Sequence, residues 1–392
     1  MVLSNKTLRF IIAIVITCLP LFSFSNTNDS VQPKHETHEV AATESKKVDE
    51  KAEIKEQIEE VKNHHVLDGH EFSLFADKET GAHYGFPLPI ILWDNGLQVF
   101  SSSEFFHHGK AKTFIDEKGH EQEYKVAKDK YAIFHEKIYI VNENGELAFE
   151  HAHPTNKAPL DFSITKSVVT IIIVALLMFL LFSSLAKSFP KNGGIASGAG
   201  RFFEPIVLYV RDEIAIPNIG EKHYKKYMSH LLTVFFFIWF LNMFGLTPLG
   251  INVTGNIAIT FGLAIITFLI TNLSANKNYW GHIFWMPGVP VPMKIILAPI
   301  ELMGLIIKPF ALMIRLYANM FAGHIVLMSL IGLMFIFKNW LGSSLSFALS
   351  FMISIIEILV ALLQAYIFTI LTALYFGSAV QEHHHDEEEA HH

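Results

Sequence analysis

The C-terminal part of the chain contains two unusually long apolar stretches, and they decide the fold. Residues 299–337 read PIELMGLIIKPFALMIRLYANMFAGHIVLMSLIGLMFIF, and residues 341–380 read LGSSLSFALSFMISIIEILVALLQAYIFTILTALYFGSAV. A helix over either stretch would be roughly 60 Å long at about 1.5 Å per residue. The hydrocarbon core of a bilayer is only about 30 Å thick, so we expect both helices either to cross it strongly tilted, about 60° from the normal, or to break. The short link Lys338–Gly342 makes them an antiparallel hairpin, and Pro309 allows a bend in the first.

Three shorter apolar runs precede this hairpin, and the basic residues between the runs predict their orientation. The runs are Ser167–Ala186, Ser229–Leu246 and Asn256–Thr271. Lys and Arg gather between the first and second runs and again after the third, which places those connections in the cytoplasm by the positive-inside rule. Within the first connection, Phe202–Val210 is typical of a helix lying on the membrane surface. The sequence therefore predicts an all-α polytopic membrane protein with about five membrane segments.

The N-terminus resembles a secretory signal peptide. Lys6 and Arg9 precede the apolar run Phe10–Leu21, and Ser23-Phe24-Ser25 offers small residues for cleavage. The single cysteine, Cys18, lies inside this segment, so a chain from which the segment is removed has no disulfide and no cysteine-based metal site. A lipobox around Cys18 is the competing interpretation, and Thr17 fits it poorly.

Residues between the signal peptide and the first apolar run predict a small β-rich domain outside the membrane. Pro87–Phe100 is an apolar stretch interrupted by the turn signal Asp94-Asn95-Gly96, and Tyr131–Phe149 repeats this pattern around Asn142-Glu143-Asn144-Gly145. The expected organisation is a signal peptide (1–25), a charged linker or helix (26–65), a β-rich periplasmic domain (66–160), a membrane domain (161–380) and a His- and acid-rich cytoplasmic tail (381–392). The expected location is a bacterial inner membrane.

Ionisable residues inside the first long stretch indicate a functional role, because placing a charge at mid-membrane costs about 2.5–3.5 kcal/mol or more. Glu301, Lys308 and Arg315 are seven residues apart and therefore share one helix face. Asn319 lies one turn beyond Arg315, whereas His324 is rotated to the opposite face. Glu301 and Lys308 are equally compatible with side chains that reach the cytoplasmic interface.

The second long stretch carries its own polar pair. Glu357 and Gln364 are again seven residues apart and share one face. Arg315 is permanently protonated, whereas His324 and Glu357 can be tuned to titrate near neutral pH. A fixed cation beside titratable groups is typical of an ion path that contains a barrier.

These residues also carry a close resemblance to a known family. The run Ile314–His324 resembles the Arg-Leu-x-x-Asn-Met-x-Ala-Gly signature of subunit a of F-type ATP synthases. Leu359–Phe368 resembles the last-helix motif of that family. Asn242, Gly245, Pro248 and Asn252–Asn256 are similar to its second and third spans, so that the resemblance covers about residues 160–380.

The resemblance implies a stator that conducts protons through two offset half-channels past a rotating ring of c subunits. Arg315 would face the ring and Gln364 would support it, while His324 and Glu357 would occupy half-channel positions that hold Glu and His in reverse order in some members. Asn319 and Asn242 would line the outer half-channel, and Glu301 would lie near the inner exit. Gly245 departs from the family, because some members have an acid there.

The partners that the resemblance implies are the c-ring, the b subunits of the peripheral stalk, the rest of the ATP synthase complex and the lipid bilayer. We expect no cofactor, no metal and no bond chemistry in this subunit. The formal net charge of −7, without a basic patch, indicates no nucleic-acid partner.

Two other classes of function remain to be weighed. An ion-coupled secondary transporter or a channel would predict an internal repeat with broken spans, and the sequence has no convincing repeat. A metal bound through histidines of the outer domain would be an added function of a membrane-anchored protein. The candidates are His64, His65, His70, His107 and His108, but their spacing fixes no third ligand.

Overall fold

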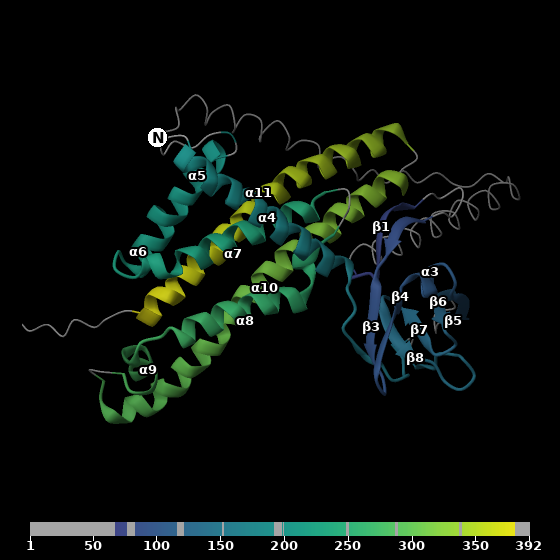
Figure 1. The fold of residues 1–392 in the computed structure, drawn as a ribbon, viewed down its shortest axis with the longest axis horizontal. Helices are drawn as coiled ribbons and strands as arrows, with labels where there is room; N and C mark the ends of the chain where they lie inside the picture. Colours follow the sequence, from purple (N-terminus) through teal and green to yellow (C-terminus); the bar gives the residue numbers. More distant parts are fainter. Residues whose placement is uncertain are drawn as a thin grey trace, which may run out of the picture. The chain divides into compact units, whose positions relative to one another are not determined.

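The chain forms a β-rich region followed by a helical region in the computed structural model (Figure 1). The structure describes residues 67–76, 83–115, 121–150, 153–191, 198, 200–247, 251–286, 289–336 and 339–380. The expected signal peptide, most of the charged segment after it and the His-rich tail lie outside the described residues.

The β-rich region consists of short antiparallel strands and one helical turn. They are β1 (Glu71–Ala76), β2 (His83–Pro87), β3 (Pro89–Trp93), β4 (Leu97–Ser101), α3 (Ser103–Phe106), β5 (Lys110–Ile115), β6 (Glu121–Ala127), β7 (Tyr131–Phe134), β8 (Lys137–Ile140), β9 (Phe149–Glu150), β10 (His153–Pro154) and β11 (Leu160–Asp161). Strands β5 to β8 form a meander, and β11 pairs with the β3–β4 hairpin. Ile90 and Leu92 alternate along β3 and are completely buried beside Phe105, as expected for a strand with one face on a core.

The first predicted hairpin is confirmed, whereas at the second a turn forms without the predicted hairpin. Asn95 and Gly96 have positive φ and join β3 to β4, with Trp93 opposite Leu97. In the second stretch the hairpin forms earlier, because Phe134 pairs with Lys137 across a two-residue turn at His135-Glu136, whose φ values are +46° and +60°. Such a turn requires positive φ at both residues, a conformation that sequence patterns predict for Asn or Gly and not for His or Glu. The segment around Gly145 forms only a local turn between Asn142 and Glu146.

The helical region contains all the predicted apolar runs as helices. Its elements are α4 (Lys166–Lys191), α5 (Gly200–Tyr209), the π-helix η2 (Val210–Ala215), α6 (Ile216–Ile219), α7 (Tyr224–Gly245), the 3-10 turn η3 (Val253–Gly255), α8 (Ile257–Leu273), α9 (Lys277–Phe284), α10 (Val291–Ile336) and α11 (Trp340–Val380). Within the described residues, four helices are long and apolar enough to cross a membrane, and five if α8 and α9, which meet at 102°, count as one span.

Helices α10 and α11 form the long antiparallel pair, packed side by side (Figure 1). They contain 46 and 41 residues. Helix α10 begins at Val291 rather than at the predicted Pro299, and it continues through both Pro299 and Pro309. Proline favours a helix start, but membrane helices tolerate an internal proline where neighbouring groups satisfy the freed carbonyl.

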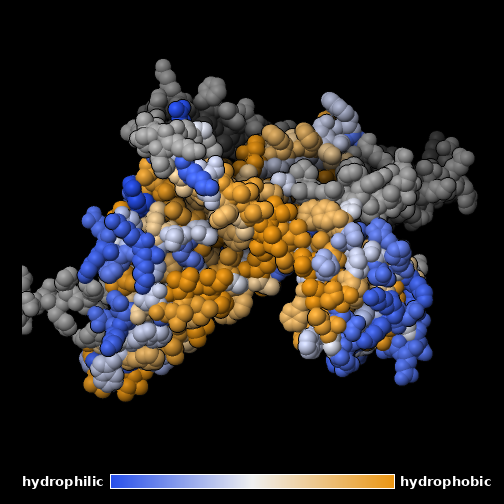
Figure 2. All heavy atoms as spheres, in the orientation of Figure 1, coloured by the Kyte–Doolittle hydropathy of each residue, from blue (hydrophilic) through white to orange (hydrophobic). Residues whose placement is uncertain are grey.

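Hydrophobic side chains cover the visible faces of the long helices, whereas hydrophilic ones gather over the strands of the β5–β8 meander (Figure 2). Large apolar residues such as Leu349, Phe351 and Leu359 are exposed on α11. A helix that is apolar on its outer surface belongs in lipid. The chain is therefore a multi-pass membrane protein with a β-rich N-terminal region.

Candidate functional site

The face of α10 that carries Arg315 points away from the packed core of the chain. Arg315 and Asn319 are both exposed, while Leu312 and Leu316, which lie within two turns of them on α10, are almost completely buried. A guanidinium stays charged at any physiological pH. The helix therefore presents a permanent cation on an outer, otherwise apolar surface.

Glu301 and Lys308 lie on α10 at half-buried positions. The Lys308 ammonium lies 5.6 Å from the ring centre of Tyr375 on α11, within the range of a cation–π contact. Lys308 thus contacts α11. It lies on α10 midway between Glu301 and Arg315.

His324 and Glu357 are buried where α10 meets α11, with exposed fractions of 4% and 8%. Gly323 is the reason for the close approach, since a Cβ atom there would lie only 2.8 Å from the Oε1 atom of Glu357. Any side chain larger than hydrogen at this position would push the carboxyl group away. The structure therefore brings Glu357 against α10 one residue before His324.

Glu357 and Gln364 both lie on the buried face of α11, although most of their neighbours along the helix are exposed. Both carboxylate oxygens of Glu357 are buried, and neither has a hydrogen-bond partner within the described part of the chain. A buried carboxyl group without such a partner is costly, and a functional role is the usual reason for one in a membrane helix.

Asn242 on α7 is completely buried and joins three segments. Its Nδ2 donates to the carbonyl of Ala361 on α11 at 3.3 Å, and its Oδ1 accepts from the Thr254 hydroxyl at 2.8 Å. Asn252 donates to the carbonyl of Met320 on α10, also at 3.3 Å. Asn242 and the turn at residues 252–256 therefore hold α7, α10 and α11 together through polar contacts in an apolar interior.

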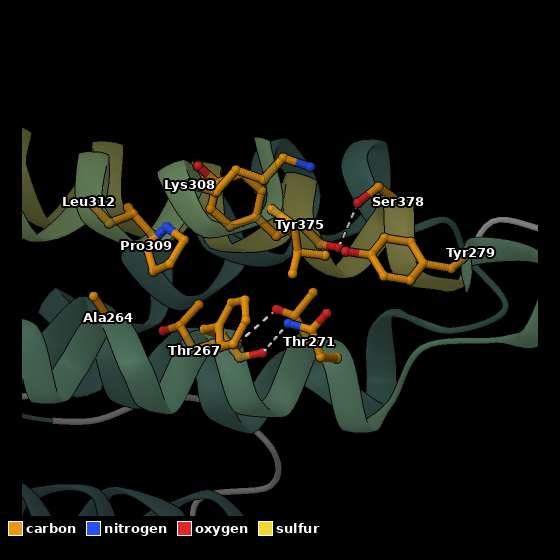
Figure 3. A pocket seen from close by; sticks show the side chains of 12 residues that line it. Ala264, Thr267, Thr271, Tyr279, Lys308, Pro309, Leu312, Tyr375 and Ser378 are labelled. Atoms are coloured by element: carbon orange, nitrogen blue, oxygen red, sulfur yellow. Dashed lines mark hydrogen bonds between the residues drawn. The ribbon is translucent and has the colours of Figure 1, made fainter. Parts of the chain in front are cut away.

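A second polar region is a pocket between α8, α9, α10 and α11 (Figure 3). Lys308, Tyr375 and Ser378 line it on one side, and Thr267 and Thr271 line it on the other, as Figure 3 shows. The pocket adjoins the stretch of α10 between Glu301 and Arg315. Hydroxyl groups and an ammonium could order water there.

Sequence reasoning missed several of these residues. Thr254, Tyr375 and Ser378 were not among the candidates. The threonines at positions 267 and 271 of α8 were a usable signal, since two hydroxyls one turn apart mark a polar stripe on an otherwise apolar helix. Thr254 had no such signal, because its partner Asn242 lies on a different helix.

The histidines of the β-rich region do not gather into a metal site where they are described. Among the described residues, no group of three or more His, Cys, Asp or Glu side chains could hold a metal ion. His70 contacts Asp161 and Glu136, whereas His107 is paired with Glu71 at 3.6 Å. His64 and His65 lie outside the described residues.

Comparison with known proteins gives two family matches. The family model for the ATP synthase A chain matches residues 168–377, and the model of a domain of unknown function (DUF8433) matches residues 61–162.

Curated relatives agree with the first match. ATP synthase subunit a of Chloroherpeton thalassium is 41% identical over 265 residues, which are 65% of this chain and 79% of the relative. ATP synthase subunit a of Chlorobium phaeobacteroides (strain BS1) is 42% identical over 270 residues, covering 65% of this chain and 78% of the relative. The corresponding protein of Myxococcus xanthus is 42% identical over 236 residues, covering 59% and 78%. The chain therefore belongs to the family of subunit a of F-type ATP synthases, whose work is ATP synthesis and proton transport.

Proposed function

We propose that this chain is the membrane stator that guides protons past a rotating ring of c subunits through two offset half-channels. The observation that carries this proposal is the position of Arg315, a permanent cation exposed on the outer face of a membrane helix. A charge placed toward lipid alone would be costly, so a partner surface must cover it. A ring that carries a carboxyl group at the same depth fits that requirement.

The outer half-channel runs along the polar contacts of Asn242, with Asn319, His324 and Glu357 on or beside it. Burial of Asn242, His324 and Glu357 in an apolar interior supports the assignment, because hydrogen-bonding side chains there can order water and pass protons. His324 and Glu357 lie at the meeting of α10 and α11, where a carboxyl and an imidazole can relay a proton.

The inner half-channel uses the pocket between α8 and α11. The pocket adjoins α10 between Glu301 and Arg315, and it is lined by Lys308 and hydroxyl groups. Glu301 lies toward the inner exit. Arg315 separates the two half-channels, because a guanidinium cannot release a proton and so blocks direct passage.

The ring carboxyl group changes its charge as it passes these two openings. It must be protonated before it enters lipid, since a charged carboxylate is expensive in hydrocarbon. Beside Arg315 the ionised form is favoured by Coulomb attraction. Protonation from one side and release to the other then bias the rotation, and Gln364 holds the surroundings of Arg315 from α11.

The long helices lie strongly tilted in this arrangement. At about 1.5 Å per residue, α10 and α11 are roughly 60–70 Å long, about twice the thickness of the hydrocarbon core. We place the β-rich region on the periplasmic side of a bacterial inner membrane and the tail after Val380 in the cytoplasm. The b subunits of the peripheral stalk and the rest of the ATP synthase are the remaining partners.

The test is ATP-driven proton pumping in inverted membrane vesicles that carry Arg315→Ala. Pumping should be lost while the complex remains assembled, because a side chain on the outer face contributes little to the fold. The matched control is Ile314→Ala, which truncates an exposed neighbour on the same helix. Normal pumping by the Arg315→Ala complex would overturn the proposal.

A further inference from the structure

A short loop of the β-rich region binds the outer ends of two membrane helices through one carboxylate. Oδ1 of Asp68 accepts a hydrogen bond from the backbone N–H of Ser167 at 3.1 Å, and Oδ2 accepts from the Thr165 hydroxyl at 2.9 Å. Oδ2 also accepts from Nδ2 of Asn256 at 3.2 Å. Asp68 is therefore bonded both to the first turn of α4 and to the residue that caps α8.

The chemistry of this contact favours a carboxylate. Asn256 caps α8, because its Oδ1 accepts from the N–H of Ala258 at 3.0 Å. Helix N-termini carry partial positive charge and unsatisfied N–H groups, and both α4 and α8 begin beside Asp68. One negative side chain thus serves the ends of two helices that are about 90 residues apart in the sequence.

Neighbouring contacts fix the loop that carries Asp68. The carbonyl of Gly69 accepts from the N–H of Lys166 at 3.0 Å. His70 is 3% exposed, with Nε2 lying 3.1 Å from Oδ2 of Asp161 and Nδ1 lying 3.6 Å from Oε2 of Glu136. Burial alone would lower the pKa of His70, but the hydrogen bonds and charges of these two carboxylates raise it to about 9. The imidazolium therefore ties the loop to the segment before α4 and to the β7–β8 turn.

Asn256 also ends the turn that reaches the buried centre of the helical region. Within five residues of chain, Asn252 contacts Met320 and Thr254 contacts Asn242, both in the interior. Asp68 itself is only half-buried. A polar series thus leads from a partly exposed carboxylate, through the turn at 252–256, to Asn242.

We infer that Asp68 is a positioning residue of the outer half-channel: by holding Asn256 at the start of α8, it keeps the turn at 252–256 aligned as the entrance for protons. This inference rests on the proposed function, since it presupposes that protons enter near Asn242. It also assigns a task to the β-rich region, which is to set the geometry of the entrance from outside the membrane.

The experiment is ATP synthesis by the full complex in inverted vesicles, where the outer side of the protein faces the lumen. The rate is measured against luminal pH and normalised to assembled complex. Asp68→Ala should raise the luminal proton concentration needed for half the maximal rate by about tenfold, the effect of losing one charged hydrogen bond, and leave the maximal rate unchanged. A purely structural defect would lower the amount of complex or its maximal rate instead.

A second variant keeps the test informative if Asp68→Ala fails to assemble. Asn256→Ser retains a capping hydroxyl for α8 but removes the amide that donates to Asp68. It should give a similar shift, and the double variant should shift no further than the larger single effect. The control Asp129→Ala removes an exposed carboxylate of the β-rich region, paired with Lys110, and should behave as the unmodified protein.

The outcomes separate this inference from the proposed function. If Arg315→Ala supports normal ATP synthesis, the proposed function fails. If Arg315→Ala abolishes synthesis at every luminal pH, but Asp68→Ala and Asn256→Ser leave the half-saturating proton concentration unchanged, only the role of Asp68 is overturned. Full additivity in the double variant would equally overturn it, because the two residues would then act separately.

Discussion

The β-rich region and the helical region bury opposite kinds of side chain. In the β-rich region, Ile90 and Leu92 are completely buried while the charged groups of Lys110 and Asp129 are exposed. In the helical region, Leu359 is 63% exposed while Asn242 is completely buried. Each region buries the side chains that its surrounding medium solvates poorly. The medium is water for the β-rich region and hydrocarbon for the helical region.

The two regions also differ in the role of their charged side chains. Some carboxylates of the β-rich region pair with lysines at the surface, as Asp129 does with Lys110 at 2.7 Å. Surface pairs of this kind contribute little to stability. Glu357 in contrast is buried among helices, where a carboxyl group costs stability. In the proposed function, this burial serves proton transfer rather than folding.

The largest expected effect that tests this difference between the two regions concerns Glu357. Glu357→Gln should lower proton flux by about tenfold or more with the complex still assembled, because an amide of the same shape cannot release a proton. Passive proton conductance of vesicles stripped of the soluble part of the enzyme measures this flux. Ser354→Ala, a half-buried position one turn away on α11, serves as the control. Unchanged conductance in Glu357→Gln would remove this residue from the path.

A second expected effect tests the difference in side-chain burial between the two regions. Ile90→Ala should lower the free energy of unfolding of the β-rich region by about 2–4 kcal/mol, because it leaves a cavity in a packed core. Leu359→Ala removes a similar volume from an exposed face of α11 and should cost less than about 0.5 kcal/mol in detergent. Proteolysis of the full-length chain over a urea series measures both. An equal loss of unfolding free energy in the two variants would contradict the conclusion that Ile90 faces a packed core and Leu359 faces lipid.

The smallest effect concerns the pH dependence of the β-rich region. The pKa of His70 is raised to about 9 in the folded state, so its ion pairs stabilise the fold fully below about pH 6.5, and this contribution is lost as the pH rises through about 9. We expect the unfolding midpoint to fall between pH 7 and 10 by the equivalent of about 1–2 kcal/mol, since Asp161 is partly solvent-screened. His70→Gln should remove most of this dependence. A wild-type midpoint that rises over this range would contradict the ion-pair assignment.

Much of the fold could be predicted from the sequence, because membrane helices are specified by composition. The run Ser167–Ala186 falls within α4, and Leu341–Val380 coincides with α11 to within one residue. Glu357 and Gln364 share one face of α11, as their spacing predicted, and the structure shows that both are buried. These features depend on length, apolarity and helical period, which are local properties of the chain.

The features that escaped prediction depend on contacts between distant residues or on unusual backbone geometry. The His135-Glu136 turn needs positive φ at two residues that rarely adopt it. Asp68 had no sequence signal, because its partners lie 99 and 188 residues away. Gly323 was visible as part of a motif, but only the packing of α11 shows that its missing side chain makes room for Glu357.

The measurement that tests the account most directly compares two quantities in the same inverted vesicles carrying Arg315→Ala. They are ATP-driven proton pumping and the passive proton conductance after removal of the soluble part of the enzyme. If Arg315 is the barrier between two half-channels, pumping is lost and the passive conductance is equal to or greater than that of the unmodified complex. If pumping persists in the assembled variant, Arg315 is a structural residue and the two-half-channel account is wrong.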